Sequence, residues 1–324
     1  MVEILVAGMF SVMSYNIRKI LIAVADPTAK GNKAIRRGAD LAGLSGASIE
    51  LFSSVSLTGS YGDISRAESR EFARLLLTQR QTQLERLAVG LRRQGFDVAC
   101  TVELDYPADH SIVRQVRRSK PDLVLIEAHK HNLFARLLLS QTDFGLIREC
   151  PVPLLIVKGA PSRARPVVLA ALDPWHAVGK PASLDSRIIE VARGLATLNR
   201  GSLHTAHVYA PMFGFVAGSV GGPSSIPISL PDAKRYKASI QKQFQAQNRK
   251  HRISSRNAHL RAGDPALELP FLARSIKAST VVMGAVSRST FKRLFIGNTA
   301  ERVLDSLPCD VLIVKPPGFR SSVS

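Results

Sequence analysis

Cysteine, tryptophan and acidic residues are scarce in this chain. Of its 324 residues, 25 are Asp or Glu against 44 Lys or Arg, and there are three cysteines and one tryptophan. The cysteines, Cys100, Cys150 and Cys309, form neither an even set nor a Cys-x-x-Cys pair. This pattern argues against a disulfide framework and favours buried thiols in a reducing compartment, so we expect a cytoplasmic protein.

Long hydrophobic runs are also missing. No apolar stretch reaches the ~18 residues that a membrane-spanning helix needs. The first twelve residues are apolar, but they include Glu3 and have no basic flank, so a secretory signal fits them poorly. With 45% apolar and 21% charged residues, the chain has the composition of a globular protein and the length of about two domains.

The common catalytic loops are absent as well. Gly179-Lys180 is no Walker loop, because Pro174 stands in place of its first glycine and Pro181 in place of its hydroxyl residue. No Gly-x-Ser-x-Gly elbow occurs. His129 and His131 have no cysteine nearby, so no metal site is predicted there. These absences favour a protein that binds over one that turns over a substrate.

Positive charge is what the composition has in excess. The formal net charge is +19, and residues Lys234–Arg261 hold nine Lys and Arg and no acid. Such a run is either a solvated helix face or a surface for an anionic partner, which would be nucleic acid or an anionic membrane. Its only aromatic residues, Tyr236 and Phe244, are too few for a platform that stacks single-stranded bases.

The chain contains an internal repeat. KILIAVADP at 19–27 recurs as VVLAALDP at 167–174, PDLVLI at 121–126 as STVVMG at 279–284, and LLIVK at 154–158 as VLIVK at 311–315. A period of about 150 residues is too long for a solenoid and indicates two copies of one domain. We expect the first domain at 15–158, a Pro-containing basic linker at 159–165 and the second domain at 166–317.

Strands and helices alternate in both copies. The first copy has predicted strands at 18–25, 48–55, 97–104, 122–127 and 154–158, and helices at 31–44, 66–94, 108–119 and 140–149. The second has predicted strands at 166–172, 202–209, 256–261, 280–284 and 311–315, and helices at 183–198, 232–250, 265–276 and 299–306. The strands are continuous apolar runs, as in parallel sheets covered on both faces. The predicted fold class is therefore α/β, with two doubly wound, Rossmann-like, five-stranded domains in tandem.

Ligands of such sheets bind at the carboxyl ends of the strands where the strand order reverses. In the second copy, Asp173, Val208 and Gly284 follow or end three strands and should meet there. Two long segments, 174–185 and 210–231, are expected near this mouth. We interpret the second as a mobile cover, whose apolar anchors would be Met212, Phe213, Phe215 and Val216.

One motif follows the fourth strand of the second copy. Gly284-x-x-Ser287, nine residues, and Gly297-Asn298-Thr299 resemble the phosphate loop of the universal stress protein family, Gly-x-x-Gly-(nine)-Gly-Ser/Thr. The following AERVLDSLPCDVLIVKP is similar to the closing helix and last strand of that family. The resemblance covers about residues 15–317 and points to its tandem members. Because it begins just after Met13, a start codon assigned twelve residues too early would explain the apolar N-terminal segment.

The resemblance implies a pocket for ATP or another adenine nucleotide, with magnesium only as a companion of that nucleotide. Asp173 and Val208 would border the base and ribose. The phosphates would be held by Gly284, Ser287, Arg288, Gly297, Asn298 and Thr299. Two positions depart from the motif: Ser287 replaces its second glycine, and Asn298 replaces its Ser/Thr, as in members that do not bind ATP.

The first copy has lost the loop. At an offset of 158, Ile126, His129, Leu139 and Ser140 stand opposite Gly284, Ser287, Gly297 and Asn298. Without glycines, backbone approach to phosphate is hindered, so we expect no nucleotide in this half. The apolar segment 133–139 either packs on a neighbouring element or lines a cavity for a lipid-like ligand.

The family further implies the strand order 3-2-1-4-5 and domain pairing through the last strands. Leu154–Val157 and Val311–Val314 would then pair inside one chain and hide two apolar edges. The expected function is non-catalytic: binding a small phosphorylated ligand in the second domain during the stress response. A slow ATP-hydrolysing enzyme, an accessory protein on nucleic acid or anionic membrane, and a homodimer of whole chains stay open as alternatives.

Overall fold

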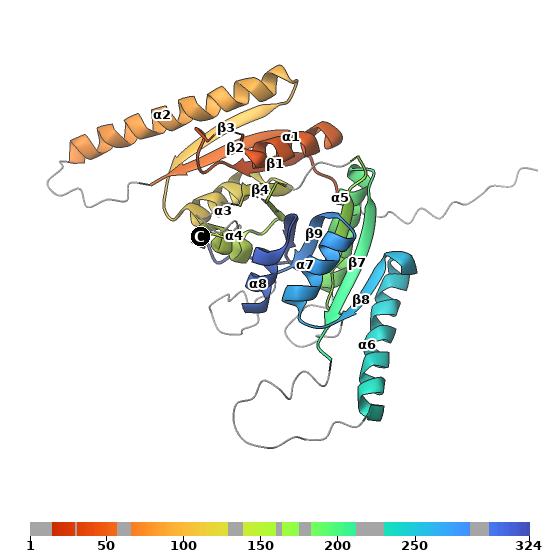
Figure 1. Ribbon diagram of the computed structural model, residues 1–324. Helices are drawn as coiled ribbons and strands as arrows, with labels where there is room; N and C mark the ends of the chain where they lie inside the picture. The colour runs from red at the N-terminus through yellow and green to blue at the C-terminus, as the bar shows by residue number, and fades with distance from the viewer. Residues whose placement is uncertain are drawn as a thin grey trace, which may run out of the picture.

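The strands of both halves form one continuous ten-stranded sheet in the computed structural model of the protein (Figure 1). The structure describes residues 15–29, 31–56, 66–128, 139–159, 164–174, 183–211, 230–285 and 298–324, and only the backbone of residues 66–67, 230–231 and 298–299. The predicted covering segment 210–231 and its four apolar anchors lie almost wholly outside these residues, as do Trp175, His129 and His131.

Each half supplies five strands and four helices to the described part of the chain. The first half consists of β1 (Lys19–Ala23), α1 (Lys33–Ser45), β2 (Ser48–Val55), α2 (Arg66–Arg93), β3 (Val98–Leu104), α3 (Ala108–Ser119), β4 (Leu123–Glu127), α4 (Gln141–Glu149) and β5 (Leu154–Val157). The second consists of β6 (Val167–Ala171), α5 (Ser183–Leu198), β7 (Ser202–Tyr209), α6 (Leu230–Lys250), η2 (Ser255–Asn257), β8 (Ala258–Ala262), α7 (Pro265–Ser275), β9 (Ala278–Gly284), α8 (Asn298–Ser306) and β10 (Asp310–Val314).

The strand order is β3-β2-β1-β4-β5-β10-β9-β6-β7-β8. Within each half all neighbouring strands are parallel, in the order 3-2-1-4-5 that the sequence analysis expects. The α/β fold with two doubly wound halves is thereby confirmed. The element boundaries agree with the predicted ones to within two residues, and at β8 the difference arises because the short helix η2 takes up the first residues predicted for the strand.

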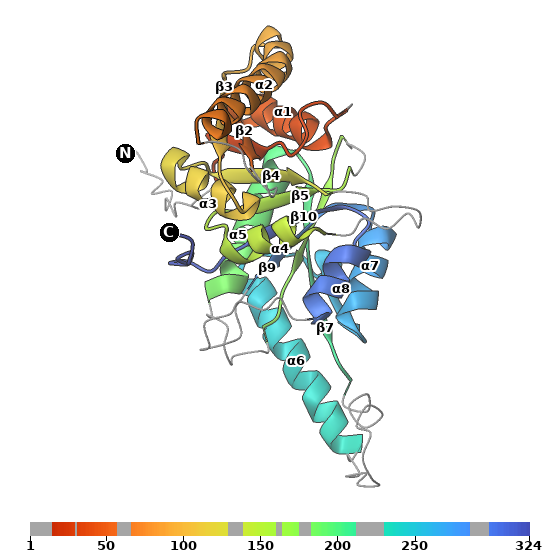
Figure 2. The same ribbon diagram turned by 90° about the vertical axis from the view of Figure 1, so that its left-hand side faces the viewer.

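Helices cover both faces of the sheet (Figures 1 and 2). Apolar side chains of α1, α2, α5 and α6 share one buried cluster with the sheet, whereas those of α3, α4, α7 and α8 share the other. The strands are therefore buried on both faces, which explains their continuous apolar sequences. None of the helices in the described part combines the length and the apolar character needed to span a bilayer.

The two halves join through β5 and β10, the one antiparallel pair in the sheet. Leu155 faces Leu312, while Ile156 faces Val311 and Leu154 faces Ile313. Equivalent residues of these two strands are 157 positions apart, and Leu155 is paired with its own equivalent, Leu312. A pseudo-twofold axis therefore passes through this pair. All these side chains are buried. The predicted pairing of Leu154–Val157 with Val311–Val314 is thus present within the chain.

A buried lysine follows each of these central strands and reaches into the other half. Lys158 Nζ donates to the carbonyl oxygens of Leu304 and Leu307 at the end of α8, the latter at 3.1 Å. Lys315 Nζ donates to the carbonyl oxygen of Arg148, at 2.7 Å, near the end of α4. Each half therefore caps the last helix of the other with a cation, which also suits the negative end of the helix dipole.

The cysteines behave largely as thiols of the core. Cys150 and Cys309 are buried, and burial raises the pKa of each thiol to about 12. Cys100 is partly exposed on β3 and, mainly through burial, its pKa is raised to about 11. The expectation of free thiols holds, but full burial applies to two of the three.

The buried lysine Lys315 predicts a particular pH dependence. Burial lowers its pKa from 10.5 to about 8, so between these pH values the unfolded chain binds more protons here than the folded one. This site therefore makes the free energy of unfolding rise from pH 8 to pH 10.5. In Lys315→Met the rise is lost, and the stability of the variant relative to the wild type falls by about 3 kcal/mol across that range.

Urea unfolding at pH 7 to 11 measures the difference. Lys242→Met, at an exposed position of α6, is the matched control and should run parallel to the wild type. A pH-independent difference between Lys315→Met and the wild type would contradict the assignment.

Candidate functional site

The carboxyl edge of the second half brings together three of the residues singled out from the sequence. β6 lies between β7 and β9, so the strand order reverses at β6. Asp173 follows β6, Val208 lies near the end of β7, and Gly284 ends β9. The strand registers put Asp173 level with Val208 and Leu172 level with Gly284. Adjacent strands are ~4.8 Å apart, so these positions occupy one small region of the edge.

Asp173 lies among polar groups. Its backbone N–H donates to Oδ1 of the buried Asp185 at 3.3 Å, and its own Oδ1 is 4.0 Å from His207 Nδ1. His207 is buried, and its Nδ1 donates to the carbonyl oxygen of Leu172 at 3.0 Å. The carbonyl can only accept, which makes Nδ1 the protonated nitrogen at neutral pH. These contacts hold the turn after β6 against the end of β7.

Gly284 is required by packing. A Cβ atom at this position would lie 2.7 Å from Leu184 Cδ2 and 3.1 Å from Ile188 Cδ1. The first turns of α5 therefore rest directly on the end of β9. The absence of a side chain here is what permits that close approach.

The remaining predicted phosphate-binding residues are described only in part. α8 begins at Asn298 and runs back toward the start of β10, so its amino terminus faces the carboxyl edge. The side chains of Asn298 and Thr299 and the whole of residues 286–297, with Ser287, Arg288 and Gly297, lie outside the described residues. The structure thus brings Asp173, Val208 and Gly284 together and leaves the others as predictions.

The first half places a carboxylate where the second half has Gly284. Val157 is paired with Glu127, and the equivalent Val314 with Gly284, so the offset between the copies is 157 here. The sequence alignment used an offset of 158 residues and set Ile126 opposite Gly284, which is wrong by one residue. The motif alone does not determine which residues of the two copies are equivalent. Glu127 Oε2 accepts the backbone N–H of Lys33 at 2.8 Å, at the first residue of α1.

The second helix at that edge of the first half is also capped internally. Ser140 Oγ accepts the N–H of Asp143 at 3.2 Å, and Asp143 Oδ2 accepts the N–H of Ser140 at 2.7 Å, which is a capping box at the start of α4. At the same offset of 157, the second half has Gly297 and Ala300. Those residues have no side-chain oxygen with which to cap α8.

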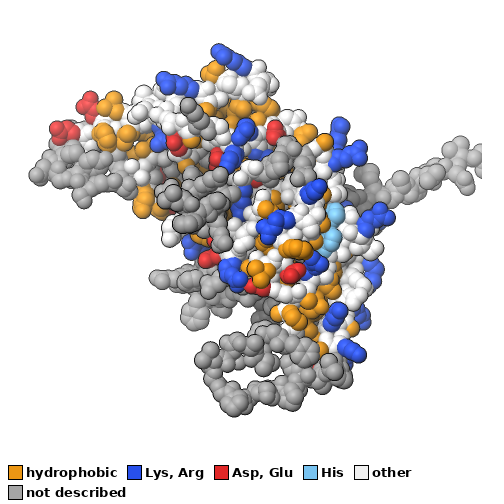
Figure 3. Space-filling view, in the orientation of Figure 1, with side chains coloured by type: hydrophobic (Ala, Val, Ile, Leu, Met, Phe, Trp, Pro, Cys, Tyr) orange, Lys and Arg blue, Asp and Glu red, His pale blue; other side chains and the backbone are white. Residues whose placement is uncertain are grey.

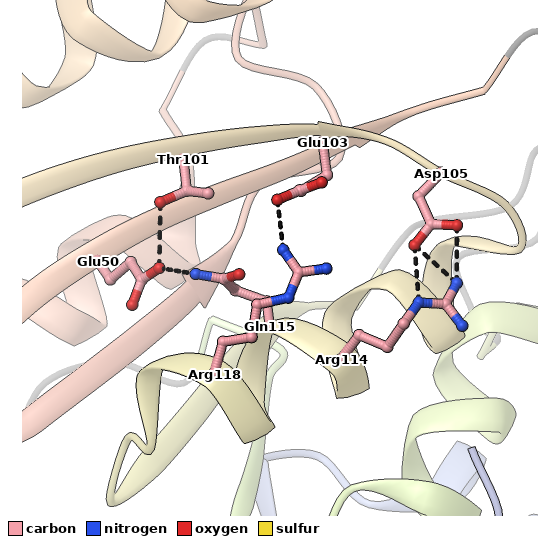
Figure 4. Close-up of polar contacts among 7 residues, drawn as sticks. All are labelled: Glu50, Thr101, Glu103, Asp105, Arg114, Gln115 and Arg118. Carbon is pink, nitrogen blue, oxygen red and sulfur yellow. Dashed lines mark hydrogen bonds and ion pairs between the residues drawn. The ribbon is translucent and has the colours of Figure 1, made fainter. Parts of the chain in front are cut away.

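A separate polar cluster lies between α3 and strands β2 and β3 (Figure 4). Glu50 accepts hydrogen bonds from Gln115 and from Thr101, the latter at 3.2 Å, and pairs with Lys19 at 2.9 Å. Although burial acts to raise the pKa of Glu50, Lys19, Gln115 and Ser119 lower it overall. Two further pairs, Arg114 with Asp105 and Arg118 with Glu103, join α3 to the edge strand β3. The figure shows three separate groups of contacts that tie α3 to β2 and β3.

Two histidines occupy the equivalent position of the second half. His204 corresponds to Glu50 and His259 to Thr101 by strand register. Their Nδ1 and Nε2 atoms are 2.9 Å apart and their rings are stacked. Burial lowers the pKa of both imidazoles. Within the described residues no group of three or more His, Cys, Asp or Glu converges as a metal site would require.

Comparison with known proteins agrees with this geometry. The model of the universal stress protein family matches residues 16–158 and 171–315. The chain belongs to the universal stress protein family. It is also 28% identical over 320 residues to Universal stress protein E of Salmonella typhi and of Escherichia coli K12, covering 94% of this chain and 96% of each relative.

Solved structures share the tandem fold of this universal stress protein. A putative universal stress protein from Pseudomonas aeruginosa UCBPP-PA14 superimposes with a TM-score of 0.70 at 23% identity, covering 93% of this chain and 94% of that one. A universal stress protein from Archaeoglobus fulgidus DSM 4304 gives a TM-score of 0.58 at 17% identity, over 91% and 98% of the two chains. At these identities the likeness concerns the fold alone.

Sequence reasoning missed the internal caps of the first half of this universal stress protein. Glu127 stands out only once the sheet register is known, because it merely follows an apolar strand in the sequence. The pair Ser140 and Asp143 was visible as a Ser-x-x-Asp pattern before an apolar run, which is a helix-start signal. Together they explain physically why this half departs from the phosphate-loop motif.

Removing the charge of Glu127 tests its capping role. In Glu127→Gln the carboxylate no longer complements the amino terminus of α1, so we expect the free energy of unfolding to fall by about 0.5–1 kcal/mol. Asp40→Asn, at an exposed position later in α1, is the matched control and should change it by less than about 0.5 kcal/mol. Urea unfolding at pH 7 and low salt measures the free energy of unfolding of both variants. An equal loss of that free energy in the two variants would contradict the capping role.

Proposed function

We propose that this universal stress protein acts by binding and not by catalysis, and that its second half holds a nucleotide or another small phosphorylated ligand. The site is the carboxyl edge around Asp173, Val208 and Gly284, completed by Ser287, Arg288, Gly297, Asn298 and Thr299. Its place in the cytoplasm, expected from the cysteine pattern, and its role in the stress response, expected from the resemblance, belong to this proposal.

One observation supports it most strongly. In the first half, carboxylates of the chain itself cap both helix amino termini at the carboxyl edge: Glu127 at α1 and Asp143 at α4. At the equivalent positions near β9 and α8 the second half has Gly284 and Ala300. The first turns of α5 and α8 do contain the acids Asp185 and Glu301, but no carboxylate stands at the two capping positions themselves. A phosphate is favoured at such a helix amino terminus, because its N–H groups and the helix dipole both attract negative charge.

An adenine nucleotide is the specific ligand that the resemblance implies. Asp173 is suitably placed to accept hydrogen bonds from a ribose, since it is partly exposed and lies level with Val208 at the edge. Magnesium would enter with the nucleotide phosphates, which supply most of its ligands in such sites. Ser287 and Asn298 depart from the residues that the phosphate-loop motif has at these positions. The proposal therefore includes a phosphorylated ligand other than ATP.

Transplanting the first-half carboxylate tests this function. Ala300→Asp puts a carboxylate into the first turn of α8, where it should compete with the phosphate and weaken ligand binding by tenfold or more. The helix itself should not suffer, because an acid in the first turn suits its dipole. Calorimetric titration with ATP, ADP and inorganic phosphate, with and without magnesium, measures the loss.

Ala246→Asp is the matched control, since it makes the same substitution at an exposed position far along α6. It should bind as the wild type does. Native mass spectrometry of protein purified from its own cells identifies a ligand that these probes miss. Equal binding by Ala300→Asp and the wild type, or steady ATP hydrolysis that Ala300→Asp abolishes, would overturn the proposal, the latter in favour of a slow ATPase.

A further inference from the structure

Three turns at the amino edge of the second half have an unusual backbone conformation. Arg200 follows α5, Arg252 follows α6 and Lys277 follows α7, with φ angles of 51°, 53° and 53°. All three side chains are exposed. Glycine is the residue that adopts this left-handed conformation without strain, so a Lys or Arg there is held at an energetic cost.

The first half shows the unstrained alternative at two of these turns, whereas at the third its Lys120, the counterpart of Lys277, has the same conformation with φ 48°. The helix ending before β2 is followed by Gly46 with φ 72°, and the helix ending before β3 by Gly95 with φ 90°. Strand registers and turn hydrogen bonds make Gly46 the counterpart of Arg200 and Gly95 that of Arg252. The second half therefore has arginine at two turns where the first half has glycine.

Acidic residues have been lost from the same edge. Asp97 and Asp122, at this edge of the first half, correspond to Ser254 and Ser279. Across the whole sequence, residues 1–158 hold 21 Lys and Arg against 16 Asp and Glu, whereas residues 159–324 hold 23 against nine. Most of the net charge of +19 therefore belongs to the second half.

Further exposed cations surround the three turns. We call the basic edge a set of seven exposed cations that come from these turns, from the last turns of α6 and α7, and from η2: Arg200, Arg249, Lys250, Arg252, Arg256, Arg274 and Lys277. Within the described part of the chain none of the seven makes an ion pair. Figure 3 shows Lys and Arg side chains gathered along the side of the molecule where α6, β7 and β8 lie.

We propose that the basic edge binds the phosphate backbone of a nucleic acid duplex. The three turns precede β7, β8 and β9 and span three strand spacings, about 14 Å. A row of that length can contact several phosphates along a duplex. Unpaired cations held in strained turns contribute little to the fold and much to such a contact, which releases counterions from the duplex.

The neighbouring side chains favour a duplex over other anionic partners. A membrane surface would require a broad exposed apolar face beside the cations, but Ile240 and Phe244 of α6 are buried. In the described second half two large apolar side chains are exposed, Leu267 and Phe271 on α7, and the guanidinium of Arg261 lies over the Phe271 ring. A single-strand binder would require exposed aromatic rings for stacking, and among the described residues of the second half the one exposed aromatic is Phe271, on α7. Phosphate contacts alone carry no sequence information, so binding should be independent of sequence.

The test replaces the three strained residues by glycine. The variant Arg200→Gly/Lys277→Gly/Arg252→Gly removes three charges and relieves the backbone, so it should keep its thermal midpoint while it loses duplex binding. Fluorescence anisotropy with a labelled 20-base-pair DNA of arbitrary sequence measures affinity at several salt concentrations. We expect at least a tenfold loss, and a salt-dependence slope lower by about 2–3, since each phosphate contact contributes about 0.9.

The control removes three exposed charges elsewhere. Arg70→Gln/Arg74→Gln/Arg86→Gln on α2 changes the net charge equally and should bind the duplex as the wild type does. A duplex RNA of the same length should also bind, since the phosphates are read and not the bases. Unchanged binding by the glycine variant, an equal loss in the α2 variant, or tighter binding to single-stranded DNA or to phosphatidylglycerol vesicles would overturn the proposal.

Discussion

The antiparallel contact between β5 and β10 is the constraint on which the rest of the molecule depends. It joins two parallel sheets into one and removes two apolar edge strands that would otherwise face water. Lys158 and Lys315 strengthen it, because each crosses the junction and caps a helix of the other half. Either lysine would be a buried cation without a partner if its carbonyl oxygens were removed, which is energetically costly. The two lysines therefore favour folding of the two halves against each other.

This junction also sets where the functional edges lie. Because the strands of the two halves run in opposite directions, the carboxyl edge of one half is on the same side as the amino edge of the other. The second half therefore presents two distinct surfaces on opposite sides: the edge around Asp173 and Gly284, and the basic edge around Arg200 and Arg252. A small ligand at the first and a polyanion at the second would not compete for the same space.

The two halves differ in how far their own side chains cap the helix termini and balance the charge. The first half caps its helix termini with Glu127 and Asp143, ends two of its helices in glycine, and balances its charge with Asp97 and Asp122. The second half has no carboxylate at those equivalent positions, and it has Arg200 and Arg252 in the left-handed turns where the first half has glycine. A satisfied half stabilises the fold, and an unsatisfied half is left with groups that attract anions.

The sequence by itself determined the α/β class, the duplication and nearly all elements, because continuous apolar runs and glycine turns are local signals. The pairing of the last strands came from the resemblance to the family. The sequence also singled out Asp173, Val208 and Gly284 as neighbours, since parallel strands end at one edge. Only the tertiary structure decided that Glu127 is the counterpart of Gly284. It also decided that Lys158 and Lys315 each cap a helix of the other half, and that Arg200, Arg252 and Lys277 form one row. Those relations depend on strand register and backbone dihedral angles, which are fixed by packing between elements and leave no mark on the local sequence.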